Sequence, residues 1–287
     1  MNLALRYVRE RFHPLYYLRK LSIGRRAVAV IDNPVWLTIP GVRFRVRGRR
    51  VTHGISYASD GAQESTATAF VLACVEQLTI CCFWDVGANF GYYTWLLKSA
   101  SPEMKAVLFE PFAPNVQLIR ETLQRHAFRD VELVFAGVSD HSGSGVLKTN
   151  PVSGHTSSLE GEVTFEERHW GVKSGLATVP LISLDEQRAL RGPVDLIKID
   201  VEGHESAVLR GAKNTIALDQ PILFVECGHP GQACLQPLLS LGYQLVDVDR
   251  LSLDLHQGST NFFCFPERFQ SKILALLDAA KSALAQA

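Results

Sequence analysis

One short stretch of this chain, F-W-D-V-G-A-N-F-G-Y-Y-T at 83–94, constrains the fold more than any other. An apolar run that ends at Trp84 meets an acid, Asp85, and then a turn that carries Gly87 and Gly91. A helix-compatible segment follows. A strand, a tight turn and a helix N-terminus in this order are typical of doubly wound α/β proteins, which bind nucleotide-like ligands at such turns.

The spacing of the glycines indicates what kind of ligand the turn suits. A dinucleotide fingerprint reads G-x-G-x-x-G, and its second glycine lets the backbone approach a pyrophosphate. Here Asn89 stands at that position. We therefore expect a ligand without a pyrophosphate. S-adenosylmethionine (SAM) fits, because its amino-acid part needs backbone N–H groups and a nearby carboxylate. A plain structural turn between a strand and a helix would carry the same pattern, so other segments must decide.

Three later apolar runs also end in polar residues. The run at 107–110 ends in Glu110, and an acid at the end of a second strand can accept hydrogen bonds from both hydroxyls of a ribose. The run at 133–140 ends in small and polar residues that suit the edge of an adenine. The run at 194–205 ends in a cluster of titratable groups. Such ends gather at one edge of a parallel sheet.

Taken together, these segments resemble the FkbM-type family of SAM-dependent methyltransferases. The matching pieces are D-V-G-A-N-F-G-Y-Y-T at 85–94, F-E-P at 109–111 with Asn115, G-V-S-D at 137–140, S-L-D at 183–185, L-I-K-I-D-V-E-G-H-E at 196–205 and V-L-R-G-A at 208–212. They span roughly residues 64 to 266. The resemblance implies methylation of a hydroxyl group, often on a sugar or a glycosylated natural product. It does not carry over the identity of the substrate.

The turn, the strand ends and this resemblance together predict the SAM site. The residues expected to bind the cofactor are Asp85, Gly87, Ala88, Asn89, Gly91, Tyr92, Thr94, Glu110, Pro111, Asn115, Ser139, Asp140 and Asp200.

An alcohol is a poor nucleophile at neutral pH, so the acceptor needs a general base or a metal ion that lowers its pKa. Asp200, His204 and Glu226 are the candidate catalytic residues. A magnesium ion held by Asp200, Glu202 and Glu226 is the alternative, because Mg²⁺ prefers carboxylate oxygens. We favour a metal-free base. Asp200 and Glu202 can also simply cap the helix expected at 204–214, since acids favour helix N-termini.

Two residues next to this cluster are expected to have structural rather than catalytic roles. Glu205 is expected on the exposed face of the following helix. Lys198 lies mid-strand among apolar residues, and a buried lysine needs a partner, so we expect it to support a carboxylate.

Residues 141–178 show no strong periodicity and are expected to form an irregular segment. Long irregular segments in compact domains are often lids or binding loops. We expect His155, Ser157 and Ser158 to contact a polyhydroxyl acceptor, together with His229 after the strand at 221–226. An ordinary surface loop is the alternative.

Strands and helices alternate from about residue 61 onward, which predicts an α/β fold with a mostly parallel sheet. The last two strands, 243–249 and 260–265, lack a helix between them and should pair as a hairpin. This predicts the class I methyltransferase (Rossmann-like) fold, with seven strands and helices on both faces, over residues 61–287. Helices are expected at 113–126 and 266–287, and a strand at 178–182. Residues 1–60 form an N-terminal helical and hairpin extension. It is expected to be helical over 1–32 and extended over 35–57, with strands at 35–39 and 42–47 around Pro40 and Gly41.

The charge of this extension is unusual. Residues 1–50 contain twelve Lys and Arg residues but two acids, so they carry +10 in a chain whose net charge is zero. We favour an N-terminal helical cap that packs on the catalytic domain. The alternative is peripheral contact with an anionic membrane, which suits a basic segment with interleaved aromatic residues. Pro14 weakens that alternative. No motif points to a nucleic-acid partner.

Composition places the chain among cytoplasmic globular proteins. No apolar run approaches the roughly 20 residues of a membrane span, and arginines interrupt any apolar signal core at the N-terminus. The six cysteines show no C-x-x-C pair and no zinc spacing, so free thiols are expected.

Two other function classes compete with an O-methyltransferase. A nicotinamide-dependent oxidoreductase is disfavoured by Asn89 and by the lack of a second α/β domain. A non-catalytic SAM-fold binding protein is disfavoured because it would have no need of the intact stretches at 85–91 and 199–205.

Overall fold

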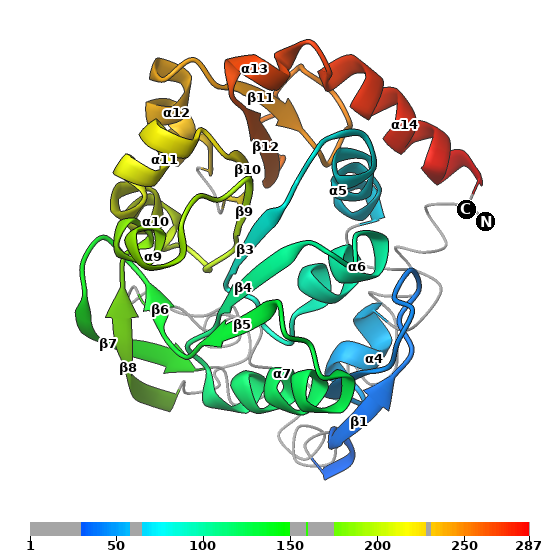
Figure 1. Ribbon diagram of the computed structural model, residues 1–287, viewed down its shortest axis with the longest axis vertical. Helices are drawn as coiled ribbons and strands as arrows, with labels where there is room; N and C mark the ends of the chain where they lie inside the picture. The colour runs from blue at the N-terminus through cyan, green and yellow to red at the C-terminus, as the bar shows by residue number, and fades with distance from the viewer. Residues whose placement is uncertain (1–29, 58–64, 150–158, 160–174, 228–230, 287) are drawn as a thin grey trace.

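The computed structural model describes residues 30–57, 65–149, 159, 175–227 and 231–286. A seven-stranded sheet forms the centre of the molecule (Figure 1). The strand order is β11 (Gln244–Asp247), β12 (Asn261–Phe265), β10 (Ile222–Glu226), β9 (Leu196–Ile199), β3 (Cys82–Val86), β4 (Lys105–Phe109) and β5 (Val131–Val134). β12 runs antiparallel to both neighbours, while the other neighbouring pairs are parallel. The predicted seven-stranded α/β fold with a closing hairpin is confirmed.

Helices cover both faces of this sheet, as predicted (Figure 1). One face carries α5 (Ser65–Gln77), α6 (Tyr92–Ala100), α7 (Ala113–His126) and α14 (Ile273–Gln286). The other carries α9 (Leu184–Arg191), α10 (Glu205–Gly211), α11 (Lys213–Asp219) and α12 (Gln236–Ser240).

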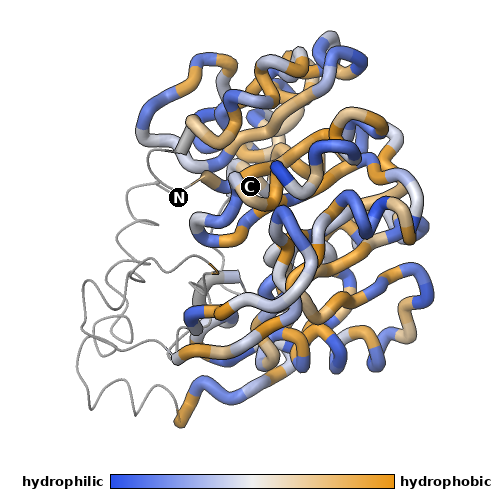
Figure 2. The backbone as a smooth tube through the Cα atoms, turned by 90° about the vertical axis from the view of Figure 1, so that its left-hand side faces the viewer, coloured by the Kyte–Doolittle hydropathy of each residue, from blue (hydrophilic) through white to orange (hydrophobic). Residues whose placement is uncertain are grey.

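The residue pattern of the strands explains how they contribute to the cores on both faces of the sheet. Successive side chains of a strand point to opposite faces, so Phe83 joins one core and Trp84 the other, and Phe224 and Val225 divide in the same way. In Figure 2, orange and blue stretches alternate along the tube, as amphipathic elements require. None of the described helices is both long and apolar enough to cross a membrane.

The hairpin before the main sheet forms, but not at the predicted place. β1 (Pro34–Leu37) pairs antiparallel with β2 (Val46–Arg49), and residues 38–45 connect them as a loop. The prediction of a strand at 42–47 was wrong because the backbone there bonds elsewhere. The Val42 N–H donates to the Ile39 carbonyl (3.0 Å), and the Arg43 N–H donates to Ser99 Oγ on α6 (3.1 Å).

The extended structure expected up to residue 57 is also corrected. A short helix, α4 (Thr52–Tyr57), follows the hairpin. The carboxylate of Asp32 accepts hydrogen bonds from the N–H groups of Val51 (2.7 Å) and Thr52 (2.9 Å), which satisfies donors at the start of the helix.

The N-terminal extension shares the core of the main domain. Leu37, Val46 and Tyr57 belong to the same buried cluster as Trp95 of α6 and Leu118 of α7. Burial of these apolar side chains ties the hairpin to the sheet. Of the helix predicted over 1–32, residues 30–32 are described; residues 30 and 31 are helical and Asp32 is not.

A second, smaller sheet occupies part of the segment that was predicted to be irregular. It contains β6 (Gly137–Val138), β8 (Gly175–Ile182) and β7 (Gly143–Thr149), in the order β6-β8-β7. The strand predicted at 178–182 is the end of β8. β7 and the start of β8 were missed because the ribbon is largely exposed and buries a small cluster, Leu147, Val179 and Leu181. Residues 150–158 and 160–174 lie outside the described chain, so a lid there stays a prediction.

Other helices are divided more finely than expected. The helix predicted at 204–214 is α10 followed by α11, with Ala212 between them. The C-terminal helix divides into α13 (Glu267–Gln270) and α14. The segment before α12 starts as a 3₁₀ helix, η1 (Gly231–Leu235).

Two of the sequence motifs turn out to serve packing. In S-L-D, Ser183 caps α9 through a reciprocal pair of hydrogen bonds with Glu186, and Asp185 accepts from the Thr215 N–H (2.7 Å) near the start of α11. In V-L-R-G-A, Gly211 ends α10 directly against Ser139. A Cβ atom at Gly211 would lie 2.1 Å from the Ser139 carbonyl oxygen.

We therefore expect Gly211→Ala to destabilise the protein by about 1–3 kcal/mol through overpacking. The melting temperature should fall by about 5 °C for a chain of this size. Gly54→Ala is the matched control, because its Cβ would meet nothing closer than 3.7 Å. A Gly211 variant as stable as the Gly54 variant would contradict this assignment.

Candidate active site

A cavity lies at the carboxyl ends of β3, β4 and β9, where ligands bind in open α/β sheets. The cavity is open to solvent, and the space inside it together with its open mouth is about 550 Å³. Its walls come from the turn after β3, the end of β4, the start of α7, the second sheet and the residues after β9. The lining residues are Gly87, Asn89, Phe109, Glu110, Pro111, Asn115, Ala136, Gly137, Val138, Leu147, Leu159, Asp200, Val201 and Glu202.

The turn after β3 is wedged between the ends of two neighbouring strands. The N–H groups of Gly87 and Ala88 donate to the Phe109 carbonyl at the end of β4 (3.0 and 3.1 Å). On the other side, a Cβ at Gly87 would lie 1.8 Å from the carbonyl oxygen of Asp200. Gly87 also has φ +74°, a conformation that favours glycine. Only glycine therefore lets the turn pass this close to β9.

Glu110 is a buried carboxylate at the cavity wall. Its Oε2 accepts from the Asn89 N–H (2.7 Å) and its Oε1 from the Phe112 N–H (2.8 Å). Burial raises the pKa of Glu110 to about 7, although these two N–H donors act in the opposite direction. The group thus holds the turn and the start of α7 together while each oxygen keeps lone pairs for a ligand.

Behind the turn, three charged side chains form a compact group. Lys198 Nζ lies 3.0 Å from Asp200 Oδ2 and 3.8 Å from Asp85 Oδ1. Asp85 is buried and also accepts a hydrogen bond from Thr94 Oγ1 (2.7 Å). Burial raises the pKa of Asp85, and the Lys198 ammonium opposes that shift. The prediction that Lys198 supports a carboxylate is confirmed, and it supports two.

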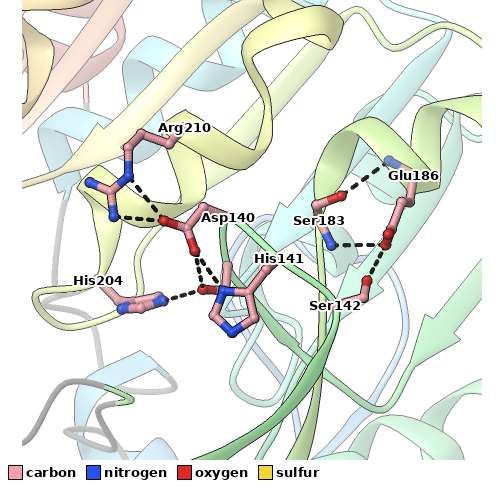
Figure 3. A network of polar contacts seen from close by, with 8 residues as sticks. Asp140, His141, Ser142, Ser183, Glu186, His204 and Arg210 are labelled. Carbon is pink, nitrogen blue, oxygen red and sulfur yellow. Dashed lines mark hydrogen bonds and ion pairs between the residues drawn. The ribbon is translucent and has the colours of Figure 1, made fainter.

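His204 lies in a separate polar network beside the cavity (Figure 3). Its Nε2 is 2.9 Å from Ser139 Oγ, and its side chain is buried. Asp140 accepts from Arg210 Nη2 (2.9 Å) and contacts His141 Nδ1 (2.7 Å), as Figure 3 shows. Hydrogen bonds from His141 and Arg210 lower the pKa of Asp140 to about 2. This network joins the segment after β6 to the start of α10.

The predicted cofactor residues divide into two groups. Those that line the cavity are Gly87, Asn89, Glu110, Pro111, Asn115 and Asp200. The others do not line the cavity among the described residues: Asp85, Ala88, Gly91, Tyr92, Thr94, Ser139 and Asp140. All of these are buried except Asp140, which is exposed; Tyr92, for example, has its hydroxyl 3.1 Å from Thr68 Oγ1. Their role in cofactor binding stays a prediction.

The remaining predicted site residues are more scattered. Glu226 is the half-buried last residue of β10 and does not line the cavity within the described chain. His155, Ser157, Ser158 and His229 lie outside the described residues.

Two expectations about the acidic residues are corrected. The structure does not bring Asp200, Glu202 and Glu226 together as a magnesium site: no group of three or more His, Cys, Asp or Glu side chains among the described residues is placed to hold a metal ion. Glu205 is not exposed. It is buried, accepts from the Gly203 N–H (3.0 Å), and its pKa is raised by burial. A short-range sequence pattern could not show that the helix turns this acid inward.

Sequence reasoning placed the end of the run at 133–140 beside a ligand but missed most of the apolar wall. It comprises Phe109, Ala136, Gly137, Val138, Leu147, Leu159 and Val201. Leu147 and Leu159 come from the segment that was predicted to be irregular. A Cβ at Gly137 would lie 2.8 Å from a methyl carbon of Leu159, so the glycine that begins G-V-S-D is the one local signal for this contact.

A family model for the methyltransferase FkbM domain matches residues 85–248. Hexuronic acid methyltransferase AglP of Haloferax volcanii is 28% identical over 136 residues, which are 46% of this chain and 50% of that protein. The chain thus spans about half the length of this curated relative.

Solved structures of methyltransferases are similar at a lower level. Methyltransferase FkbM from Methylobacillus flagellatus has a TM-score of 0.46 and 17% identity over 68% of this chain and 48% of that one. The O-methyltransferase from Bacillus cereus, in complex with S-adenosylhomocysteine (SAH), has a TM-score of 0.41 and 12% identity over 91% and 96%.

The charged group behind the turn makes a prediction about stability. Lys198→Met leaves the buried Asp85 carboxylate without its cation, which should cost about 3–5 kcal/mol of unfolding free energy near neutral pH. The cost should shrink as the pH falls, because Asp85, whose pKa is raised, takes up a proton. Chemical denaturation measures both effects. Adding Asp85→Asn to Lys198→Met should recover part of the loss, and a double variant as unstable as the sum of both single variants would contradict this coupling.

Proposed function

Because this chain belongs to the FkbM family of methyltransferases, we propose that it transfers the methyl group of SAM to a hydroxyl of a sugar or a glycosylated metabolite. The observation that carries the proposal is the cavity at the end of β4, where Glu110 stands between a glycine turn and an apolar wall. The family match also favours a methyltransferase over the nicotinamide-dependent oxidoreductase.

The residues of the cavity fit SAM in three respects. Glu110 is placed to accept hydrogen bonds from the two ribose hydroxyls, as acids at this strand end do. The wall of Val138, Leu147 and Leu159 offers an apolar slot for an adenine. Asn115 Oδ1 is buried at the cavity without a hydrogen-bond partner among the described residues, so a ligand donor would satisfy it.

The charge of the cavity also suits this cofactor. Three carboxyl groups line it, those of Glu110, Asp200 and Glu202. SAM carries a sulfonium, a positive charge whose methyl group is displaced by an acceptor in line with the carbon–sulfur bond. Acidic walls favour a cation through charge complementarity.

Asp200 is the group that we assign to the acceptor hydroxyl. It lines the cavity at the end of β9, directly beside Gly87, and Lys198 holds its Oδ2. A carboxylate fixed in this way can accept the hydroxyl proton as the new bond forms. Holding the hydroxyl in line with the methyl group contributes further, because positioning alone can supply about 7–11 kcal/mol.

His204 is assigned a positioning role in this proposal. Its Nε2 is already close to Ser139 Oγ, so it acts on the wall of the cavity through Ser139. Glu226 ends the neighbouring strand and stays a candidate for contact with the acceptor.

The proposed acceptor is a sugar hydroxyl. The name of the relative AglP points to hexuronic acids, which offer both hydroxyl groups and a carboxylate. The carboxyl groups that line the cavity here would repel an anionic acceptor group placed at Asp200. Charge repulsion therefore supports a hydroxyl as the methylated group and an ether as the product.

The raised pKa of Glu110 predicts how cofactor affinity depends on pH. Only the ionised carboxyl group accepts charge-assisted hydrogen bonds at both oxygens, so SAH should bind about tenfold more tightly at about pH 8 than at about pH 6. The stability of the protein without cofactor depends on pH in the opposite direction. Because the pKa of Glu110 is raised in the folded protein, the free energy of unfolding falls as the pH rises from about 4.5 to about 7.

Calorimetric titration with SAH at several pH values tests this. Glu110→Gln should bind SAH more weakly and with little pH dependence over the same range. Equal pH dependence in the Gln variant and the parent protein would show that another group is responsible.

The assignment of Asp200 predicts a selective loss of turnover. Asp200→Asn should lower kcat by about 10²–10⁴-fold, the usual effect of losing a general base, while SAH affinity stays within a few-fold. Glu202→Gln is the matched control, since Glu202 lines the same cavity, and its kcat should change far less. His204→Ala and Ser139→Ala should change kcat and SAH affinity by similar factors, because His204 acts through Ser139.

The assay follows SAM-to-SAH conversion with neutral sugars and hexuronic acid glycosides as acceptors. Methyl groups that survive mild alkali are ethers, whereas alkali-labile ones are esters of the carboxylate. An ester product, or a Glu202→Gln variant that loses more turnover than Asp200→Asn, would overturn the assignment of the hydroxyl or of Asp200. No conversion of any acceptor despite SAH binding would favour a non-catalytic binding protein.

A further inference from the structure

We propose that an arginine-rich face, made by the β1–β2 hairpin and the end of α7, docks this protein on an anionic lipid surface. Figure 1 shows β1 and α7 next to one another, away from the second sheet. We define this face by six arginines. Arg45, Arg47 and Arg125 contact Trp36, and Arg43, Arg49 and Arg50 are their neighbours along the hairpin.

Side-chain burial along the hairpin leaves these charges outside. Val42 and Val46 are buried in the main core, and Phe44 packs against it. Arg43, Arg45 and Arg50 are exposed, whereas Arg47 and Arg49 are half-buried. The main domain buries the apolar side of the hairpin and leaves the charged side to solvent.

Trp36 sits at the centre of this face and holds the arginines in place. The Arg125 guanidinium lies 4.5 Å from the centre of the Trp36 ring, and that of Arg47 lies 5.4 Å away. Arg45 Nη2 donates to the Trp36 carbonyl (2.8 Å). His126 Nε2 is 2.7 Å from the Arg45 carbonyl, which joins α7 to the hairpin. The charges are thus mounted on a rigid surface.

Few acidic side chains neutralise this face. Among the described residues, Arg47 pairs with Glu121 (2.6 Å), and the other five arginines of the face form no ion pair. The first 50 residues carry +10, and the rest of the chain is correspondingly acidic. An asymmetry of this kind orients a protein toward a negatively charged partner.

Apolar residues beside the charges favour a lipid surface over a nucleic acid. Val30 and Ile31, which lead into the hairpin, are 80% and 45% exposed. The sequence before them mixes leucine, tyrosine and phenylalanine with arginine. Trp36 itself is half-buried. Interfacial binding combines apolar insertion with attraction to anionic headgroups, whereas a nucleic acid has no use for exposed aliphatic side chains.

The position of the face leaves the cavity accessible. Asn115 lines the cavity near the start of α7, and Arg125 lies ten residues later, about 15 Å along the helix axis. A lipid surface at Arg125 therefore does not cover Asn115, and docking and catalysis can proceed together.

Flotation of the full chain with vesicles tests the proposal. We expect binding to phosphatidylcholine vesicles that contain phosphatidylglycerol, no binding to phosphatidylcholine alone, and release by high salt. The triple variant Arg43→Ala/Arg50→Ala/Arg125→Ala should bind the anionic vesicles roughly 100-fold more weakly, because each arginine near such a surface contributes about fivefold.

The control is Lys213→Ala/Lys272→Ala/Lys281→Ala, which removes the same charge from exposed positions on other helices. It should keep nearly full vesicle binding, and both variants should bind SAH like the parent. Absence of vesicle binding by the parent, or an equal loss in the control, would overturn the proposal. Tighter binding of the parent to duplex DNA than to the anionic vesicles, at the same salt, would assign the face to nucleic acid instead.

Discussion

The close approach of the Gly87 turn to the backbone of Asp200 is the contact on which the rest of the site depends. It brings the ends of β3 and β9 together at a distance that no side chain at position 87 could share. The turn is held from the other side by the Phe109 carbonyl and by Glu110. Two carboxylates, Asp85 and Asp200, are crowded at the same point, and the junction is possible because Lys198 lies between them. The junction of β3 and β9 therefore depends both on the backbone geometry at Gly87 and on the charge balance that Lys198 provides.

Ionisation of Glu110 is unfavourable in the empty site and becomes more favourable when a ligand binds. A carboxyl group buried at this depth costs free energy when it is ionised, and its raised pKa expresses that cost. Two backbone N–H donors offset part of it, and hydrogen bonds from a ligand would offset more. The same group that weakens the empty protein at neutral pH thus strengthens the complex. An active site and a stability optimum make different demands on one side chain.

The sequence predicted those helices and strands whose apolar residues recur at a regular spacing and are buried on one side. The helix at 113–126 was found at its exact bounds because its apolar positions repeat every three or four residues and Pro114 marks its start. β7 was missed, and β8 was predicted only from residue 178 onward, because their exposed ribbon has few buried residues. The burial of Glu205 and the contact between His204 and Ser139 depend on packing between segments far apart in the chain, which no short pattern encodes.

The motifs of the family divide according to what they do in space. D-V-G-A-N and F-E-P meet at the cavity wall, whereas S-L-D caps helices and the glycine of V-L-R-G-A lets α10 touch Ser139. Ser139 in turn contacts His204, which belongs to L-I-K-I-D-V-E-G-H-E. A residue can therefore belong to a recurring motif without touching a ligand, since it fixes the position of one that does. Asp200 shows the other case, because it belongs to L-I-K-I-D-V-E-G-H-E and itself lines the cavity.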